Sequence, residues 1–206
     1  MMALSAIFLM VFLIQHLLIN ITSTFSISIF NSLSHFMGTS LIVQFILQPI
    51  LIFGVLFHFL MGFYLEYSNK KARTNNYIKI NNQSNSSWIS RNMIISGLVI
   101  FVFLILHFID FWIPEIQYKY IDFLPENPDR YYSELKHKFN NPIRVIVYCI
   151  SFVLLSLHLL HGFASSLKSL GTNKKYISHI KFFGYIYSIG VPLAFCFIAL
   201  FHYFNH

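Results

Sequence analysis

Charged residues are scarce in this sequence and are missing from its first 65 positions. Only 10% of the 206 residues are Asp, Glu, Lys or Arg, and none of these types occurs between Met1 and Leu65. Soluble domains carry roughly 25% charged residues, because their surfaces face water. A soluble globular fold is therefore excluded, and the 56% hydrophobic content predicts an integral membrane protein.

Cysteine is scarce as well. The chain has two cysteines, Cys149 and Cys196, which both lie in apolar segments, and it has no C-x-x-C-H motif. This argues against a disulfide framework, a cysteine-based metal site and covalent attachment of haem. Any metal centre must use histidine, of which there are ten.

Five apolar stretches approach or exceed the roughly 20 residues that a membrane-spanning helix needs. They are residues 2–24, 40–65, 90–113, 143–167 and 180–204. Barrel strands alternate over about 10 residues, whereas these runs are continuous, so the sequence predicts an all-α membrane protein. We expect residues 1–206 to form one domain, a bundle of five transmembrane helices. The first stretch lacks a basic leading region and a cleavage pattern, which favours a retained span over a signal peptide.

The charged loops predict the orientation of the bundle. Segment 66–91 has five basic residues and one acid, segment 168–181 has four lysines and no acid, and segment 110–144 has six acids and five bases. By the positive-inside rule, the first two face the cytoplasm and the third faces outward. This predicts a cytoplasmic N-terminus, an outer loop at residues 25–39 and an outer C-terminus. The net charge of +7 therefore reflects topology, and no nucleic-acid partner is expected.

Prolines predict that the outer segment 110–144 is made of loop and short helical pieces. They are Pro114, Pro125, Pro128 and Pro142.

Four histidines inside the spans are the main chemical signal, because ionisable groups are costly in a bilayer and usually face a functional site. At a rise of about 1.5 Å per residue, His58 and His158 lie about 12 and 15 Å from the cytoplasmic ends of their spans. His16 and His107 lie about 22 and 24 Å from theirs. The four therefore predict an inner pair and an outer pair, separated by about 10 Å.

One histidine on each of two helices at matched depth is what a six-coordinate haem iron needs, so the sequence predicts two b-type haems. Gly62 and Gly162 each follow an inner-pair histidine by one helical turn and leave room for a flat macrocycle. Bis-histidine ligation leaves no open iron position, which favours electron transfer. Two alternatives stay open: hydrogen bonds between helices in place of ligation, and His161 as the ligand in place of His158.

The remaining glycines and histidines have simpler predicted roles. Four glycines predict close helix contacts: Gly54, Gly97, Gly184 and Gly190. Four histidines at helix ends or in loops are expected at the membrane interface: His137, His179, His202 and His206.

Three segments carry a resemblance to a known family: residues 12–20 (FLIQHLLIN), 30–37 (FNSLSHFM) and 86–93 (SSWISRNM). With the histidines in the same order along the whole chain, they resemble the diheme cytochrome b subunit of succinate:quinone oxidoreductases and fumarate reductases. The likeness is to the five-helix, single-anchor, menaquinone-linked type, in its Bacteroidetes-like form. The other ligands fall where the family has them: His58 with Gly62, His107 with Asp110, and His158 with Gly162. Family members usually carry a short basic stretch before helix one, whereas this sequence starts Met-Met-Ala-Leu-Ser.

The resemblance implies a membrane anchor of respiratory complex II in a bacterial inner membrane, with two partner subunits. A flavoprotein would oxidise succinate at the cytoplasmic face, and an iron–sulfur protein would pass electrons to the inner haem. Menaquinone would be the quinone substrate, and the anchor itself would bind no succinate. Donors for the propionates of the inner haem are expected at the cytoplasmic edge, where the candidates are Trp88, Ser90, Arg91, Lys168 and Lys181.

Quinone chemistry is expected beside the outer pair, because electrons that enter from the cytoplasm reach the inner pair first. Polar candidates at that depth are Asn20, Asn31, His35 and Asp110.

Two rival functions remain open. A non-haem transporter or assembly factor would favour broken helices and intramembrane carboxylates, and we expect no acid in the interior of a span. A diheme anchor of another dehydrogenase, or of a hydrogenase, would have the same histidine pattern and is separated only by the family motifs.

Overall fold

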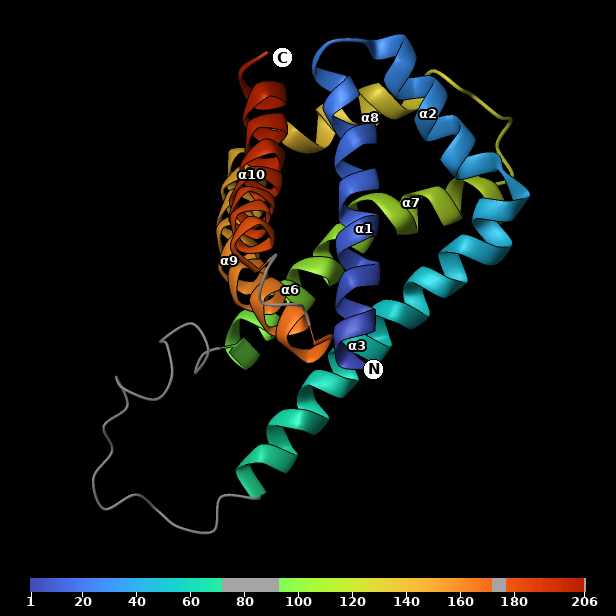
Figure 1. Cartoon of the computed structure of the whole chain (residues 1–206). Helices are drawn as coiled ribbons and strands as arrows, with labels where there is room; N and C mark the ends of the chain where they lie inside the picture. The colour runs from blue at the N-terminus through green and yellow to red at the C-terminus, as the bar shows by residue number, and fades with distance from the viewer. Residues whose placement is uncertain (72–92, 172–176, 206) are drawn as a thin grey trace.

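The structure is a computed structural model that describes residues 1–71, 93–171 and 177–205, and those residues form helices joined by short links, with no strand among them. Within this part of the chain, five helical stretches are long and apolar enough to cross a membrane. They are Met2–Thr24, Val43–Lys71, Met93–Ile121, Pro142–Leu167 and His179–Phe204. The predicted all-α bundle of five spans is therefore confirmed (Figure 1).

The helices have the following bounds. In chain order they are α1 (Met2–Ile21), α2 (Ile27–Thr39), α3 (Gln48–Lys71), α6 (Met93–His107), α7 (Ile113–Ile116), α8 (Arg130–Phe139), α9 (Pro142–Ser169) and α10 (Ile177–Phe204). A 3-10 turn, η1 (Thr22–Thr24), follows α1. Three π-helical turns occur in the second and third spans: η2 (Val43–Leu47), η3 (Phe108–Trp112) and η4 (Gln117–Ile121).

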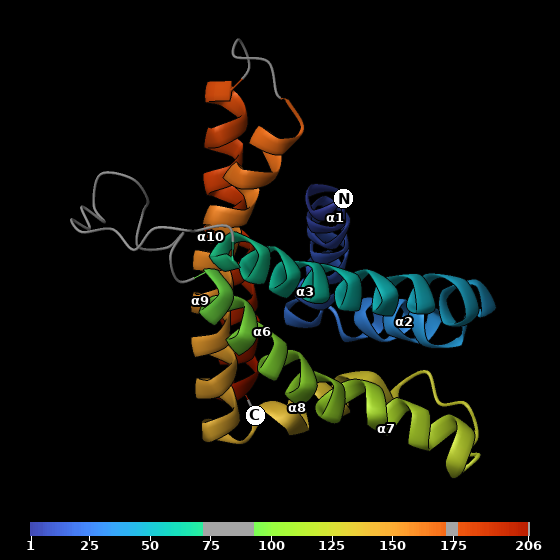
Figure 2. The same ribbon diagram turned by 90° about the horizontal axis from the view of Figure 1, so that it is seen from below.

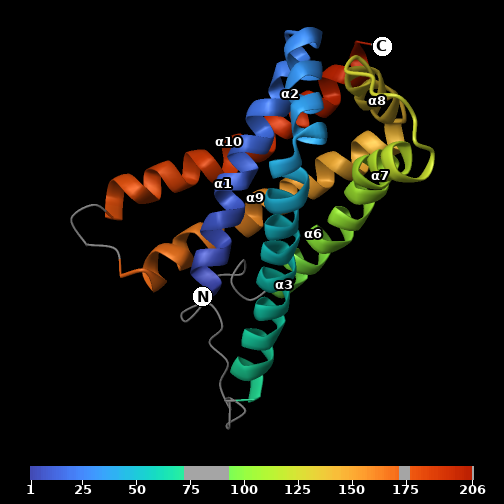
Figure 3. The same cartoon turned by 90° about the vertical axis from the view of Figure 1, so that its right-hand side faces the viewer.

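The helices α9 and α10 run side by side, whereas α3 and α6 lean away from that pair (Figure 2). Between them α1 packs against α3, α9 and α10. One end of the bundle carries α2, α8 and the C-terminus, and we call it the α2–α8 end. The opposite end carries the start of α1 and the end of α3, and we call it the N-terminal end (Figure 3).

The buried core joins α9 and α10 to the two short helices α2 and α8. Phe30 of α2 and Phe139 of α8 pack with Tyr148 and Phe152 of α9 and with Phe195 of α10. Most of the remaining apolar side chains on the spans face outward, as expected where the solvent is lipid.

Residues 25–39 were expected to form a loop, but most of them form α2. Its first turn is capped by Ser26, whose Oγ accepts a hydrogen bond from the N–H of Ile29 at 3.3 Å. Phe30 and Asn31 face the protein and are buried, while Ile27 and Phe36 on other faces are exposed. This helix is too short to span a membrane, so a search for long apolar runs does not detect it.

The sequence predicts that the third span ends before Pro114, but in the structure this span continues to Ile121. Proline lacks an N–H and cannot bond the carbonyl four residues earlier. The π-helical turns η3 and η4 on either side of Pro114 adjust the backbone, a known solution in membrane helices. Asp110 and Glu115 therefore lie within the span, and the expectation of no acid in a span interior is wrong.

Candidate functional site

The structure brings the four span histidines together in the two pairs that their depths predict. The ring centres of His58 on α3 and His158 on α9 are 6.4 Å apart, and those of His16 on α1 and His107 on α6 are 5.8 Å apart. Imidazoles on opposite sides of one metal ion, with metal–nitrogen bonds of about 2.1 Å, have ring centres roughly 6 Å apart. Both separations fit that arrangement.

The two pairs lie at different levels of the bundle. Ser5 on α1 contacts His58, while His16, eleven residues further along the same helix, lies against His107. Eleven residues of helix rise about 16 Å. This is more than the separation of about 10 Å expected from the distances to the span ends, and it leaves room for two separate sites.

The inner pair is assembled from four helices. The Nδ1 atom of His58 is 3.1 Å from Oγ of Ser5 on α1, and the Nδ1 atom of His158 is 3.1 Å from Oγ of Ser96 on α6. A Cβ atom on Gly97 would lie 3.6 Å from Cε1 of His158, so this glycine faces the imidazole. Sequence reasoning missed all three of these neighbours of the histidines, because a serine or glycine in a span has many other uses.

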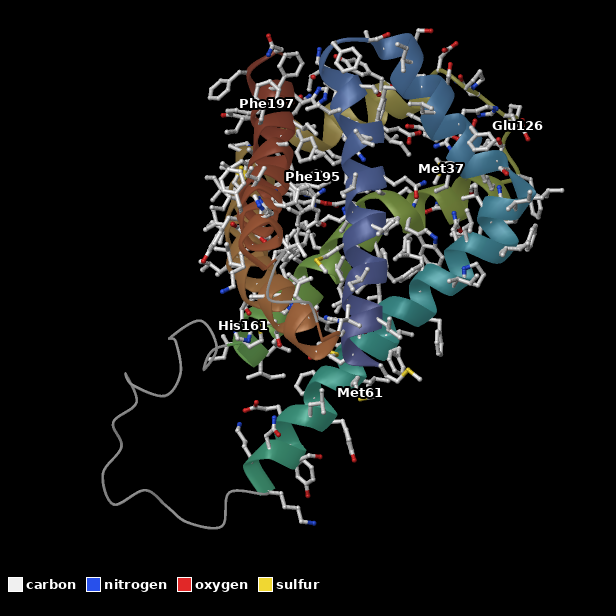
Figure 4. All side chains as sticks on the ribbon, viewed as in Figure 1. Met37, Met61, Glu126, His161, Phe195 and Phe197 are labelled. Atoms are coloured by element: carbon white, nitrogen blue, oxygen red, sulfur yellow. The ribbon has the colours of Figure 1, made fainter. Side chains whose placement is uncertain are left out.

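The outer pair sits in an aromatic surrounding. Phe12 stacks on His16 with ring centres 5.6 Å apart, and Phe195 approaches the same ring at 5.6 Å. Figure 4 shows Phe195 pointing from α10 toward α1, whereas Phe197 lies on the outer side of α10. The Nδ1 atom of His16 has only Asn20, four residues along, at 3.5 Å. The buried Nδ1 atom of His107 has no hydrogen-bond partner among the described residues.

These pairs fit haem better than a bare metal ion. No group of three or more His, Cys, Asp or Glu side chains that could hold a metal ion occurs in the described part of the chain. Haem iron needs only two protein ligands, since the porphyrin supplies four nitrogens. Within the same residues no hydrogen bond joins the two rings of either pair, but each inner histidine is hydrogen-bonded to a serine of a neighbouring helix, so hydrogen bonding between helices stays open as an alternative for the inner pair.

The ring whose centre is measured against that of His58 is His158. His161 lies three residues further along α9, nearer the N-terminal end of the bundle (Figure 4). The geometry thus favours His158 over His161 as the partner of His58.

The glycines near the inner pair face methionines. A Cβ atom on Gly62 would meet Cε of Met2 at 3.7 Å, and one on Gly162 would meet Cε of Met93 at 3.7 Å. Both are ordinary contacts with the flexible ends of side chains, so neither glycine is required by the protein packing alone.

Of the four glycines expected at helix contacts, two pack tightly against phenylalanines of neighbouring helices. They are Gly54, against Phe8, and Gly184, against Phe163. For Gly190 the expectation is wrong, because nothing lies within 4 Å of its Cβ position.

The predicted propionate donors are mostly not described. Trp88, Ser90 and Arg91 lie outside the described residues, and so does the side chain of Lys168. Lys181 lies near the start of α10 and is exposed, at the N-terminal end of the bundle.

Three of the four quinone candidates have partners within the protein. Asn31 donates to the carbonyl of Asp129 at 3.1 Å and accepts from the N–H of Tyr132 at 2.8 Å, which ties α2 to the start of α8. Asn20 donates to the carbonyl of His16 at 2.8 Å. Asp110 is described next.

Asp110 forms a buried cluster with two residues of α9. Its Oδ2 atom accepts a hydrogen bond from the hydroxyl of Tyr148 at 2.8 Å, and its Oδ1 atom is 2.7 Å from Nη1 of Arg144. The Tyr148 ring also lies 6.3 Å from that of His107. The cluster therefore joins η3 to α9 beside the outer pair.

His35 is the quinone candidate with an uncommitted polar atom. Its Nδ1 atom is buried and has no partner among the described residues, and its Nε2 atom is 3.9 Å from the exposed carboxylate of Glu126. The ring of Tyr131 lies 6.2 Å away.

A groove that sequence reasoning did not predict opens at the α2–α8 end. Its volume is about 270 Å³, and it lies between the start of α3 and the helices that follow His107. Its polar lining includes Gln44, Trp112, Glu115 and Lys119. The hydroxyl of Tyr120 donates to Oε1 of Gln44 at 2.7 Å, so this wall of the groove is hydrogen-bonded.

Behind the groove lies a network of charges centred on Arg130. Its guanidinium bonds the carboxylates of Glu115 and Glu134 and lies over the rings of Tyr118 and Tyr131, at 4.1 and 4.4 Å from the ring centres. Burial alone would lower the pKa of Arg130, but the two carboxylates outweigh this effect and raise it. Burial, together with the charge of Glu115, raises the pKa of Tyr131 to about 12.

His202 lies near the end of α10, as expected, but it faces the protein interior. Its side chain is buried, with 1% of the residue exposed, and its Nε2 atom is 2.8 Å from Oγ of Ser23. The hydroxyl of Ser23 donates its proton to the carbonyl of Asn20. In the hydrogen bond between Ser23 and His202, the histidine is therefore the donor. His202 thus fastens the end of α10 to the end of α1.

The fold is that of a helical protein with five candidate membrane spans, and it holds two close histidine pairs between those spans. Comparison with known proteins finds no matching family model, no similar curated protein and no similar solved structure. The resemblance to the diheme cytochrome b subunits therefore rests on the three sequence segments and the order of the histidines.

Proposed function

We propose that this chain is the membrane-anchor cytochrome b subunit of a succinate:quinone oxidoreductase, with one b-type haem at each histidine pair. The observation that carries the proposal is the spacing of the rings, 5.8 and 6.4 Å, in two pairs contributed by four different spans. His58 and His158 would hold the inner haem, and His16 and His107 the outer haem. When bound, the haems would supply one-electron carriers at two depths, between an iron–sulfur partner and menaquinone.

The chain's own residues support such a role in two ways. The helices hold the two pairs about 16 Å apart along α1, in the interior of the bundle. The aromatic rings around the outer pair, such as Phe12 and Phe195, exclude water from the histidines.

The quinone would react at the α2–α8 end, which the proposal assigns to the outer side of a bacterial inner membrane. The groove near Gln44 and Trp112 is open and has exposed apolar rims at Phe45 and Ile52, so a lipid-soluble molecule could enter from the bilayer. His35, with its unpartnered Nδ1, is the alternative contact.

The transporter alternative gains one feature, since the third span holds acids and π-helical turns. These acids are paired, however: Asp110 with Arg144, and Glu115 with Lys119 and Arg130. Acids that are held in ion pairs with neighbouring bases support a structural role better than a transport path. A diheme anchor for another dehydrogenase or a hydrogenase shares the site, and only the partner subunits separate it from our proposal.

The test is the haem content of the purified full chain. A reduced-minus-oxidised spectrum, with a haem-to-protein ratio from a pyridine haemochrome assay, should show two low-spin b haems per chain. A haem-to-protein ratio near one would contradict the proposal of two haem sites. A chain that binds no haem would favour the transporter or assembly factor. Co-purification of a flavoprotein with succinate dehydrogenase activity would separate the leading proposal from the other anchors.

A further inference from the structure

The inner pair differs from the outer pair in what its Nδ1 atoms contact. Both inner histidines have a serine hydroxyl from a neighbouring helix at 3.1 Å, Ser5 for His58 and Ser96 for His158. In the outer pair, His107 has no Nδ1 partner among the described residues, and His16 has only the distant amide of Asn20. The difference is therefore one of hydrogen bonding and not of burial alone.

The serines also fix the direction of these hydrogen bonds. Oγ of Ser5 donates its proton to the carbonyl of Met2 at 2.8 Å, and Oγ of Ser96 donates to the carbonyl of Met93 at 2.9 Å. A hydroxyl has one proton, so each serine can only accept from the histidine. Nδ1 of His58 and of His158 must then carry the ring proton, and Nε2 is left with the free lone pair that a metal ligand needs.

We propose that Ser5 and Ser96 are positioning residues that hold His58 and His158 in the ligating tautomer and stabilise the oxidised state of the inner haem. This inference rests on the function proposed above. Ferric iron withdraws more electron density from an imidazole than ferrous iron does, so the Nδ1–H group is a stronger donor in the oxidised state. A hydrogen bond to serine therefore favours the oxidised state and lowers the reduction potential.

Ser96 is followed by Gly97, whose Cβ position lies 3.6 Å from Cε1 of His158. The two adjacent residues of α6 thus lie against one imidazole: Ser96 accepts a hydrogen bond from the ring, while a Cβ atom on Gly97 would make an ordinary contact with it.

The experiment compares Ser5→Ala, Ser96→Ala and the double variant with the unmodified full chain in membranes. Ser151→Ala is the matched control, because Ser151 is a buried serine of a span whose Oγ, among the described residues, bonds only the carbonyl of Val147, at 2.8 Å. The His58→Ala variant identifies which spectral component belongs to the inner haem. The readouts are haem content and an optical redox titration of each component.

Each serine variant should make the inner haem easier to reduce. At a fixed potential, its ratio of reduced to oxidised form should rise by about two- to tenfold for each hydrogen bond lost, while the outer haem is unchanged. Ser96→Thr, which keeps a hydroxyl, should titrate like the unmodified chain. Selective loss of the inner haem in the double variant, with both haems kept in Ser151→Ala, would also support the proposal.

Two results would overturn it. The first is two haems with unchanged titrations in all the serine variants, and the second is an equal shift in Ser151→Ala. A failure of the proposed function is seen separately, because the unmodified chain would then bind no haem at all.

Discussion

At the scale of single residues, the histidines of the spans are distinguished by their ring nitrogens. In the inner pair one nitrogen of each ring is bonded to a serine, and within the described residues the other makes no hydrogen bond. His202, in contrast, bonds Ser23 through Nε2, the nitrogen that the proposal assigns to iron in His58 and His158. Burial alone therefore does not make a histidine a candidate ligand, and His202 illustrates the structural use.

Removing an inner-pair histidine should remove one haem. We expect His58→Ala or His158→Ala to lower the haem-to-protein ratio from two to one, because a single imidazole does not hold low-spin iron. The ratio is measured by pyridine haemochrome assay, with His161→Ala as the control that keeps both haems. Loss of a haem in His161→Ala would instead move the ligand on α9 by one turn.

The pair of Asp110 and Arg144 should contribute to stability. Arg144→Gln leaves a buried carboxylate without its cation, and we expect a cost of about 1–3 kcal/mol, since Arg144 itself is partly exposed. Thermal unfolding in detergent, followed by far-UV circular dichroism, measures the loss. The double variant with Asp110→Asn should recover most of it, because the amide can still accept from Tyr148. Equal unfolding temperatures for Arg144→Gln and the unmodified chain would show that the pair is not stabilising.

At the scale of elements, length and apolar content were sufficient to predict three of the five spans within one residue, whereas the second span ends six residues later than predicted, at Lys71. The third span was predicted too short, because Pro114 is ordinarily a helix breaker and nothing in the local sequence indicates that π-helical turns will accommodate it. The amphipathic α2 was missed for a related reason: its pattern is set by Phe30 and Asn31 facing α8, a contact between segments about 100 residues apart.

Asn31 should act as a structural tie between α2 and α8. Asn31→Ala removes two hydrogen bonds to backbone groups around the start of α8 and should destabilise the protein by about 1–3 kcal/mol, mainly through the unsatisfied groups left behind. Thermal unfolding is again the measurement, and Ser32→Ala on the exposed face of α2 is the control. A variant with unchanged stability but reduced quinone turnover would instead favour the role as a quinone contact.

At the scale of the whole molecule, the pairing of the histidines could be predicted because depth in a membrane helix is nearly proportional to residue number. The direction in which a side chain points could not be predicted in the same way, since helix rotation depends on packing. For this reason Asp110, predicted to begin the outward-facing segment 110–144 and named as a quinone candidate, was not expected to lie buried against Arg144 and Tyr148. The groove near Gln44 was missed because its lining residues are scattered between positions 38 and 120 and meet only when three helical segments pack together.

The orientation of the bundle remains a prediction of the charged loops. A reporter that is active only in the cytoplasm should work when it is fused after Lys175 and fail when it is fused after His206, because the lysine-rich segment 168–181 is retained on the cytoplasmic side. Reporter activity in intact cells is the measurement, normalised to the amount of each fusion protein. The reverse pattern would put His16 and His107 nearest the cytoplasm and exchange the inner and outer pairs.

Turnover with quinone should respond to the membrane potential. An electron that moves between the two pairs travels about 16 Å along α1, roughly half of a hydrocarbon core of about 30 Å. A full crossing is worth about 2.3 kcal/mol per 100 mV, so this path is worth about 1 kcal/mol. An interior-negative potential favours outward movement of electrons, and succinate-to-menaquinone activity in energised vesicles should fall when an ionophore collapses the potential.

The matched control for this measurement is an artificial acceptor that takes electrons from the soluble partner subunits, since that path does not cross the bilayer and its rate should not change with the potential. If the ionophore leaves the quinone reaction unchanged as well, electrons do not cross the distance between the pairs before they reach quinone. The quinone would then react on the cytoplasmic side, near Ser5 and Ser96, and neither the groove at the α2–α8 end nor His35 would take part.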